Sequence, residues 1–206
     1  MWELIKGKIR QMTGLQQQLD GTSPNGEMTR FRFGPARVGE TSVYGAERPG
    51  YNSRSVDAGP VQEWIAFMKE NGILRVCCLL SPKQLAYYQP ALLDQYGAAF
   101  GVVNVCAVEV DDYNLCDQET LELKVLPFFY ESDRVTARVV VHCSGGSGRT
   151  GHVLAAWLVR HRELSVDDAL AAVVATDRNP YEAVQCGNAT NAQLRRLLAG
   201  NTPRAV

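Results

Sequence analysis

Apolar residues recur along this chain in two spacings, and from about residue 60 onward the two spacings alternate. Spacings of three and four residues predict an amphipathic helix that passes through Trp64 and ends at Asn71-Gly72. Continuous apolar runs at 74–80, 102–110 and 138–141 predict buried strands. Further helices are predicted at 82–96 with a break at Pro90, and at 117–128, 150–162, 166–176 and 192–199.

This alternation of helices and buried strands predicts an α/β protein: a single domain with a mostly parallel central sheet flanked by helices. Two short β-like stretches, 31–33 and 42–44, precede it. Asp117 can cap the 117–128 helix, and Pro127 inside that helix implies a kink or an early end.

The predicted domain spans residues 31–200. Residues 1–30 are expected to form an N-terminal extension, with a short basic amphipathic helix at 1–12 and a turn-rich linker at 20–26. The extension's helix can pack on the domain or lie on a membrane surface. Residues 201–206 are expected to form a C-terminal tail.

Composition narrows the possible functions. The 206 residues are 46% hydrophobic and 21% charged, with a formal net charge of −1, so no basic field indicates a nucleic-acid partner. The apolar runs are too short to cross a membrane, so no stable membrane insertion is expected. The six cysteines fit no zinc pattern, and we expect no metal site and a reducing, cytoplasmic location. The oligomeric state stays open.

The most informative segment of the chain lies between a predicted strand and a predicted helix. It reads His142-Cys143-Ser144-Gly145-Gly146-Ser147-Gly148-Arg149-Thr150. The three glycines permit a tight loop whose backbone N–H groups point inward and form an anion cradle. The next helix adds the positive end of its dipole, and Arg149 adds a planar fork that can bind two phosphate oxygens.

The same cradle favours the thiolate of Cys143, which makes this residue the candidate nucleophile. Attack on phosphorus would produce a phosphocysteine, with the cradle stabilising the equatorial oxygens. His142 is expected to orient the loop through backbone hydrogen bonds. A hydroxyl of Thr150 or Ser147 can steady the sulfur as it leaves in the second step.

This segment resembles the signature of the cysteine-dependent protein tyrosine and dual-specificity phosphatases: His-Cys, five residues, Arg, then Ser or Thr. Weaker similarity extends over about residues 36–198, and it is strongest to small microbial dual-specificity members. The resemblance implies a phosphatase that needs no metal or organic cofactor. It also implies a general acid, an aspartate on a loop before the signature.

The acid is expected in the segment 108–114. Aligning Val108 and Val110 with the family's apolar positions places Asp112 on the acid, and Asp111 is the alternative. Glu109 stands where the family often has proline, and alternation turns it away. Such an acid, working with a thiolate, predicts a bell-shaped pH profile on the acidic side of neutral.

The substrate is less determined. No lysine stands between Cys143 and Arg149, which mildly favours phosphoprotein substrates over phosphoinositides. Phosphotyrosine in proteins or peptides is the leading expectation, and a shallow cleft would also admit phosphoserine and phosphothreonine. The alternatives are a phosphatase of inositol phosphates or other small phosphate esters, a phosphoprotein-binding module with little turnover, and a rhodanese-type sulfur transferase. The intact Cys143, Arg149 and acidic loop disfavour the binding module, and the His-Cys start and the Arg-Thr-Gly ending disfavour the sulfur transferase.

Several nearby residues are interpreted as structural. Arg178-Asn179-Pro180 is expected in a surface loop, although the family resemblance allows an arginine or an amide there to touch substrate. Tyr51 and Arg54 can form a rim or simply a solvated turn. Cys77 and Cys78 are expected to pack in the core rather than to protect Cys143 by a disulfide.

Overall fold

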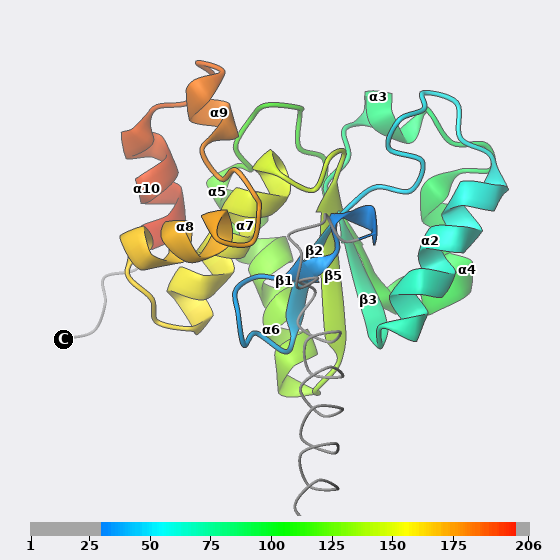
Figure 1. Ribbon diagram of the computed structural model, residues 1–206, viewed down its shortest axis with the longest axis horizontal. Helices are drawn as coiled ribbons and strands as arrows, with labels where there is room; N and C mark the ends of the chain where they lie inside the picture. The colour runs from blue at the N-terminus through cyan, green and yellow to red at the C-terminus, as the bar shows by residue number, and fades with distance from the viewer. Residues whose placement is uncertain (1–29, 201–206) are drawn as a thin grey trace, which may run out of the picture.

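The computed structural model describes residues 30–200 (Figure 1). The predicted helix at 1–12, the linker at 20–26 and the tail at 201–206 lie outside the described residues. A five-stranded sheet with strand order β1-β2-β5-β3-β4 forms the centre of the domain. The strands are β1 (Gly34–Pro35), β2 (Val43–Glu47), β3 (Ile73–Cys78), β4 (Val105–Ala107) and β5 (Arg138–Cys143). Only the pairing of β1 with β2 is antiparallel, which confirms a single α/β domain with a mostly parallel sheet.

Helices cover both faces of the sheet (Figure 1). The helices are α2 (Ala58–Glu70), α3 (Pro82–Leu85), α4 (Leu92–Phe100), α5 (Gln118–Thr120), α6 (Leu126–Arg134), α7 (Gly148–His161), α8 (Val166–Val174), α9 (Glu182–Gln185) and α10 (Asn191–Ala199). In β5, Val140 belongs to the core beneath α2 and α4, whereas Val139 and Val141 belong to the core beneath α6 and α7. A strand buried on both faces must be apolar at consecutive positions, which explains the continuous run in this strand.

The start of the domain differs from its prediction. Residues 31–33 were expected to be β-like, but η1 (Arg30–Arg32) is a 3-10 turn in which Phe31 has a φ of 60°. The rings of Phe31 and Phe33 both pack edge-on against Phe67 of α2. The apolar residues at this position therefore serve contacts with a helix instead of strand pairing.

The predicted strand at 102–110 is also wrong in extent. β4 is only three residues long, and it follows a 3-10 turn, η2 (Val102–Asn104). Val102 and Val103 are 79% and 84% exposed, so this apolar run is not a buried strand. β4 lies at the edge of the sheet, where it pairs only with Val76–Cys78 of β3.

The helix predicted at 117–128 continues to Arg134. Between α5 and α6 the chain forms a π-helical segment, η3 (Leu121–Val125). In a regular α-helix the ring of Pro127 would clash with the carbonyl of Leu123, one turn earlier. That carbonyl lies in the wider π-helical turn, which accommodates the proline. The alternative of an early end is therefore wrong.

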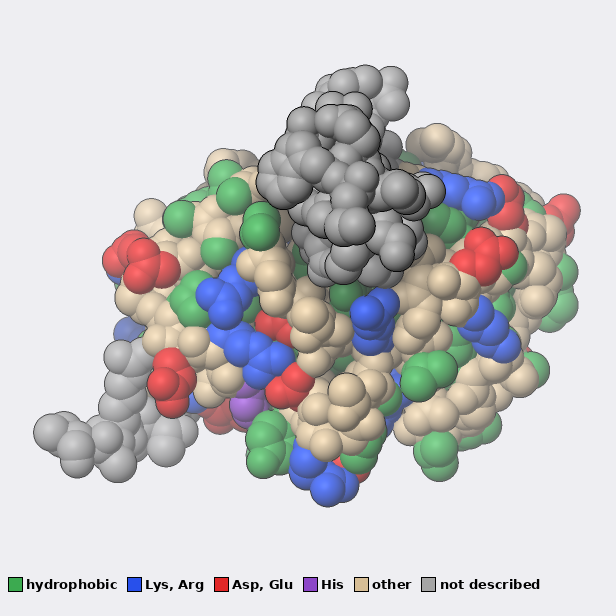
Figure 2. Space-filling view, turned by 60° about the horizontal axis from the view of Figure 1, so that its bottom comes forward, with side chains coloured by type: hydrophobic (Ala, Val, Ile, Leu, Met, Phe, Trp, Pro, Cys, Tyr) green, Lys and Arg blue, Asp and Glu red, His purple; other side chains and the backbone are tan. Residues whose placement is uncertain are grey.

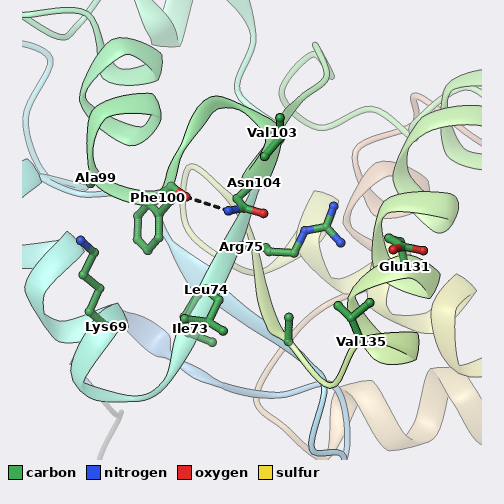
Figure 3. A pocket seen from close by; sticks show the side chains of 11 residues that line it. Lys69, Ile73, Leu74, Arg75, Ala99, Phe100, Val103, Asn104, Glu131 and Val135 are labelled. Carbon is green, nitrogen blue, oxygen red and sulfur yellow. Dashed lines mark hydrogen bonds between the residues drawn. The ribbon is translucent and has the colours of Figure 1, made fainter.

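A hollow of about 710 Å³ opens at the start of β3 (Figure 3). Ile73, Leu74 and Arg75 line it, together with residues of α2, α4, η2 and α6. On the face seen in Figure 2, basic and acidic side chains are interspersed, and the described part of that face shows no continuous basic surface. The described residues include no helix long and apolar enough to cross a membrane.

Candidate active site

The glycine-rich loop connects the carboxyl end of β5 to the first turn of α7, at the edge of the sheet where α/β proteins bind ligands. Cys143 is the last residue of β5 and is 3% exposed. Gly146 has a φ of 65°, and a β-carbon there would lie 2.6 Å from the Ala46 backbone. Glycine is therefore required at this turn for both its conformation and its lack of a side chain.

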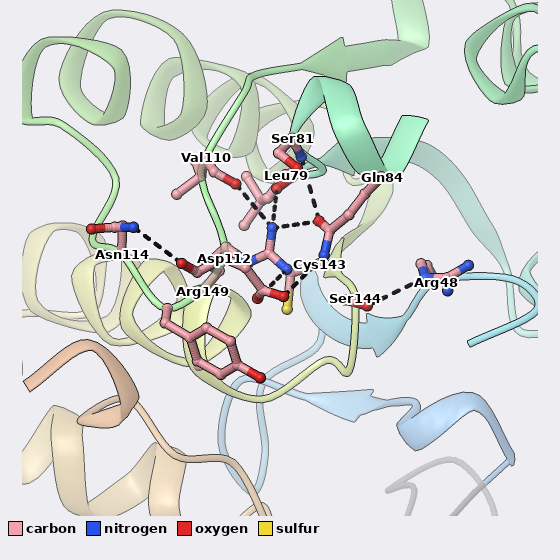
Figure 4. Close-up of polar contacts among 12 residues, drawn as sticks. Arg48, Leu79, Ser81, Gln84, Val110, Asp112, Asn114, Cys143, Ser144 and Arg149 are labelled. Atoms are coloured by element: carbon pink, nitrogen blue, oxygen red, sulfur yellow. Dashed lines mark hydrogen bonds and ion pairs between the residues drawn. The ribbon is translucent and has the colours of Figure 1, made fainter. Parts of the chain in front are cut away.

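Arg149 is almost fully buried, and most of the hydrogen bonds of its guanidinium are made by one nitrogen, Nη1 (Figure 4). Its Nη1 donates to the carbonyl oxygens of Leu79 and Val110, at 3.2 and 2.9 Å, and to Oε1 of Gln84 at 2.8 Å. Its Nη2 donates to Oδ1 of Asp112 at 2.8 Å, while its buried Nε has no hydrogen-bond partner within residues 30–200. Nε and Nη2 together form the edge with which a guanidinium binds an oxyanion. Within residues 30–200, the Asp112 carboxylate is the only hydrogen-bond partner along that edge.

The loop after β4 places Asp112 beside this arginine. Val108 and Val110 are buried and Glu109 and Asp111 are exposed, as alternation predicts, but Asp112 is exposed as well, so the alternation ends at Asp111. The Asp112 side chain is 41% exposed and forms an ion pair with Arg149. In the view of Figure 4, the Cys143 sulfur projects toward these two groups. The structure thus brings together the predicted nucleophile, the predicted arginine and the preferred candidate for the acid.

Gln84 is a residue that the sequence did not indicate. It is 6% exposed, lies in α3, and touches both Arg149 and Asp112. A glutamine shortly after Ser81-Pro82 is typical of a helix start. Ser81 and Gln84 do form a capping box. Its contact with the site depends on tertiary structure, since Arg149 is 65 residues away along the chain.

His142 contacts the backbone at the start of the glycine-rich loop. Its ring Nδ1 lies 3.3 Å from the carbonyl oxygen of Cys143, so Nδ1 carries the proton, and Nε2 accepts from the Tyr96 hydroxyl at 3.1 Å. The ring also packs edge-on against Trp64. Burial lowers the pKa of His142 to about 3, so the ring is neutral. A neutral ring of fixed orientation can position the loop without adding a charge.

His152, in α7, joins the loop that carries Asp112 (residues 108–116) to the glycine-rich loop (Cys143–Arg149). Its Nε2 accepts from the backbone N–H of Cys116 at 3.0 Å, and its Nδ1–H donates to the carbonyl oxygen of Gly148 at 3.2 Å. Burial lowers the pKa of His152 to about 4. His152 is thus a buried link between the two loops.

Two hydroxyls were candidates to steady the sulfur. Ser147 Oγ accepts from the backbone N–H of Asn179 at 3.1 Å, so it is engaged with another loop. Thr150 Oγ1 is buried and has no hydrogen-bond partner among the residues that the structure describes. Accepting that bond leaves the Ser147 O–H free to donate, so both hydroxyls remain candidates.

Arg178 does not lie in a surface loop, so that prediction is wrong. The side chain is 4% exposed, and its guanidinium donates to backbone carbonyl oxygens at distances of 3.0 to 3.4 Å. These acceptors belong to Arg32, Gly34, Pro35, Gly45 and Thr176. Desolvation lowers the pKa of Arg178 to about 10, against the attraction of the Cys143 charge.

Other side chains shape the mouth of the site. The Tyr51 ring lies over Gly145, where a β-carbon would approach it to 3.3 Å, and this tyrosine is 45% exposed. The Glu182 carboxylate lies so close to Gly148 that a side chain there would collide with it. Burial, with the Asp112 charge as a second cause, raises the pKa of Glu182. Within the described chain there is no cluster of three or more side chains suited to a metal ion.

Comparison with known proteins finds the same fold in solved structures. Tk-PTP in its active form shares the fold, with a TM-score of 0.56 and 23% identity over 75% of this chain and 92% of its own. PTPMT1 has a TM-score of 0.57 and 14% identity over 81% of this chain and 93% of its own. It has also been solved in complex with PI(5)P, at a TM-score of 0.53 and 12% identity, covering 81% and 94% of the two chains. No curated protein sequence matches the chain.

The family described as "Polymorphic toxin system, DSP-PTPase phosphatase" matches residues 51–163, which is more than half of the chain. The matched region contains Cys143, Arg149, Asp112 and Gln84. This chain therefore belongs to the DSP-PTPase phosphatase family of polymorphic toxin systems, and with it to the cysteine-dependent protein tyrosine phosphatase superfamily.

Proposed function

We propose that this phosphatase hydrolyses phosphotyrosine in proteins or peptides through a phosphocysteine at Cys143. The observation that carries the proposal is the guanidinium of Arg149. It is anchored through Nη1, and among the described residues the only hydrogen-bond partner along its Nε–Nη2 edge is the Asp112 carboxylate. A phosphate dianion can take the place of that carboxylate and accept two parallel hydrogen bonds.

Arrival of the substrate also prepares the acid. Once phosphate occupies Nε and Nη2 of Arg149, Asp112 loses its cationic partner and faces a negative charge. The Cys143 thiolate attacks phosphorus, the bond from phosphorus to the leaving oxygen breaks, and Asp112 gives its proton to that oxygen. Backbone N–H groups of the loop and Arg149 stabilise the charge on the three equatorial oxygens.

The second step reverses the roles. A water molecule attacks the phosphorus of the phosphocysteine and gives its proton to Asp112, which now acts as a base. The bond from phosphorus to sulfur breaks, the thiolate is restored and inorganic phosphate leaves. The Thr150 hydroxyl, which is buried without a partner within the described residues, can donate to the departing sulfur.

The rim of the site supports an aryl phosphate with one phosphate group. The exposed Tyr51 ring beside Gly145 offers a flat wall for a phenyl ring. Around the loop stand carboxylates, Glu182 and Glu47, whose pKa values are raised chiefly by burial. No lysine lies between Cys143 and Arg149. These groups offer little to hold a second phosphate. The proposal also includes phosphoserine and phosphothreonine, whose side chains are smaller than that of phosphotyrosine, as further substrates.

The second candidate is a phosphatase of inositol phosphates or other small phosphate esters. It is favoured by one observation: the similarly folded PTPMT1 was solved with PI(5)P. A binding module with little turnover is disfavoured, because a binder has no use for Asp112 beside the arginine. We place the activity in a reducing, cytoplasmic compartment because the six cysteines, Cys143 among them, are free thiols.

The test is a substrate panel: peptides with phosphotyrosine, phosphoserine or phosphothreonine, phosphoinositides and inositol phosphates, with phosphate release measured for the wild type and Cys143→Ser. The expected result is the highest kcat/KM on phosphotyrosine peptides and a loss of at least about 10⁴-fold in the variant. Acid quenching of the wild type during turnover should trap a phosphocysteine. Preference for an inositol phosphate would select the second candidate, and full activity of Cys143→Ser would overturn the mechanism.

A further inference from the structure

The side-chain amide of Gln84 is bonded at both ends to groups of the active site (Figure 4). Its Oε1 accepts from Nη1 of Arg149 at 2.8 Å, and its Nε2 donates to Oδ2 of Asp112 at 3.1 Å. We propose that Gln84 is a positioning residue that holds the phosphate-binding arginine and the general acid in register. This inference rests on the proposed function, in which Asp112 is the acid.

Gln84 lies in the short segment that follows β3, and hydrogen bonds within this segment hold it in place. Ser81 begins α3, and its N–H donates to Oε1 of Gln84 at 3.4 Å, while the Gln84 N–H donates to the Ser81 carbonyl oxygen at 2.9 Å. Two residues before Ser81, the Leu79 carbonyl oxygen accepts from Nη1 of Arg149. The same short segment therefore holds the arginine twice, once through its backbone and once through Gln84.

The chemistry of an amide suits this double role. Its oxygen only accepts and its nitrogen only donates, so one orientation serves a cation at one end and a carboxylate at the other. Because Gln84 binds Nη1, it leaves the Nε–Nη2 edge of Arg149 free for phosphate. Its grip on the arginine can therefore persist when substrate replaces Asp112 on Nη2.

At the other end, the contact decides which oxygen of Asp112 carries the acidic proton. Oδ2 accepts the Nε2–H of Gln84, so a proton on Oδ2 would face a donor. The proton therefore belongs on Oδ1, the oxygen that faces Arg149 and is released when phosphate binds. Gln84 thus keeps the half-exposed carboxyl group in place after its ion pair is broken.

Two variants separate the two ends of the amide. Gln84→Leu removes both contacts. Gln84→Glu keeps an oxygen for Nη1 of Arg149 but places a second carboxylate against Asp112. The matched control is Gln95→Leu, because Gln95 is a similarly buried glutamine, on α4, that bonds Gln62 and the Pro90 carbonyl oxygen instead. Thermal unfolding of all three variants measures any general loss of stability.

The first readout compares phenyl phosphate, whose leaving group needs a proton, with p-nitrophenyl phosphate, whose leaving group needs it much less. Gln84→Leu should lower kcat/KM on phenyl phosphate about tenfold more than on p-nitrophenyl phosphate, as expected for a misplaced general acid. In Gln84→Glu, the alkaline limb of the pH profile should move to higher pH, because the added charge makes the proton of Asp112 harder to lose. Gln95→Leu should change neither measurement.

The second readout needs no turnover. Tungstate binding, measured by calorimetry, should weaken several-fold in Gln84→Leu because Arg149 loses an anchor, and Gln95→Leu should bind as the wild type does. Equal losses on the two esters together with an unmoved pH profile in Gln84→Glu would overturn the role toward Asp112. Unchanged tungstate binding in Gln84→Leu would overturn the role toward Arg149. If the wild type cleaves neither ester, the proposed function fails, and the tungstate result still decides the role toward Arg149.

Discussion

The two loops that form the active site are built in different ways. The phosphate loop, Cys143–Arg149, is held at both ends by regular structure, β5 and α7, and the side chains of Cys143 and Arg149 are almost fully buried. The acid loop, residues 108–116, has no regular structure, and the side chain of Asp112 is 41% exposed. The first loop is shaped chiefly by its own residues, whereas the second is positioned by residues distant in the sequence.

This difference shows in what holds the acid loop. Val110 and Asp112 are bound by Arg149, Cys116 is bound by His152, and Gln84 reaches Asp112 from α3. Three of these contacts come from the phosphate loop or the helix that follows it. The phosphate loop and α7 thus supply most of the side chains that place the acid loop, in addition to bonds from the Cys78 carbonyl oxygen and the Asn188 side chain.

The largest expected effect comes from the residue that joins the two loops. In Arg149→Lys, a point charge replaces a planar fork, so the carbonyl oxygens of Leu79 and Val110 lose their donor and phosphate loses a bidentate partner. We expect kcat/KM on p-nitrophenyl phosphate to fall on the order of 10³-fold. A loss of less than tenfold would mean that the acid loop is held in place without the arginine.

The next effect concerns the acid loop alone. Asp112→Asn should lower kcat on phenyl phosphate by about 10²-fold, because the leaving oxygen loses its proton donor. Tungstate should bind this variant several-fold more tightly, since no carboxylate competes for Nη2 of Arg149. The matched control is Asp111→Asn, which alters the exposed neighbouring residue and should stay within about twofold of the wild type. A reversal of the two results would move the acid to Asp111.

The support beneath the phosphate loop predicts a dependence of stability on pH. Burial lowers the pKa of His142 to about 3 and that of His152 to about 4, from an ordinary value of 6.5. Below pH 6.5 the unfolded chain therefore binds more protons than the folded one, so stability is lost as pH falls. Between pH 6 and pH 4, these two histidines should contribute a slope of at most about 2.7 kcal/mol per pH unit.

Urea unfolding at a series of pH values measures this slope. His142→Asn, in which no side chain can be protonated, should reduce it by up to half. An unchanged slope in this variant would show that His142 is not the source. Activity that falls in this variant at every pH, with an unshifted profile, would agree with a ring that positions the loop and carries no charge.

The smallest effect tests whether the phosphate loop is as constrained as its geometry indicates. Gly146 has a φ of 65°, and the β-carbon added by Gly146→Ala would lie 2.6 Å from the Ala46 backbone. We expect this substitution to lower the free energy of unfolding by about 2 kcal/mol. Gly39→Ala is the matched control, since Gly39 has a φ of 81° but nothing within 4 Å of its β-carbon. It should cost about 1 kcal/mol. Equal costs would mean that close packing does not constrain the loop.

The two loops also differed in how far the sequence predicted them. The order of strand, glycine loop and helix around Cys143 was readable because strand burial, turn glycines and helix periodicity act over a few residues. The apolar run at 102–110 was misleading, because Val102 and Val103 lie exposed beyond the end of the strand. Whether an apolar run pairs as a strand depends on its partner, and β4 pairs with three residues of β3. No local pattern carries that information.

The sequence by itself determined the α/β class, the phosphate loop and the chemistry available to Cys143 and Arg149. Tertiary structure alone decided that Arg178 is buried, that Gln84 enters the site and that Asp112 lies on the free edge of Arg149. The physical reason is the range of the interactions. Backbone conformation and helix dipoles are set by near neighbours along the chain. A buried guanidinium or amide is placed by hydrogen-bond partners that only folding brings within 3 Å or so.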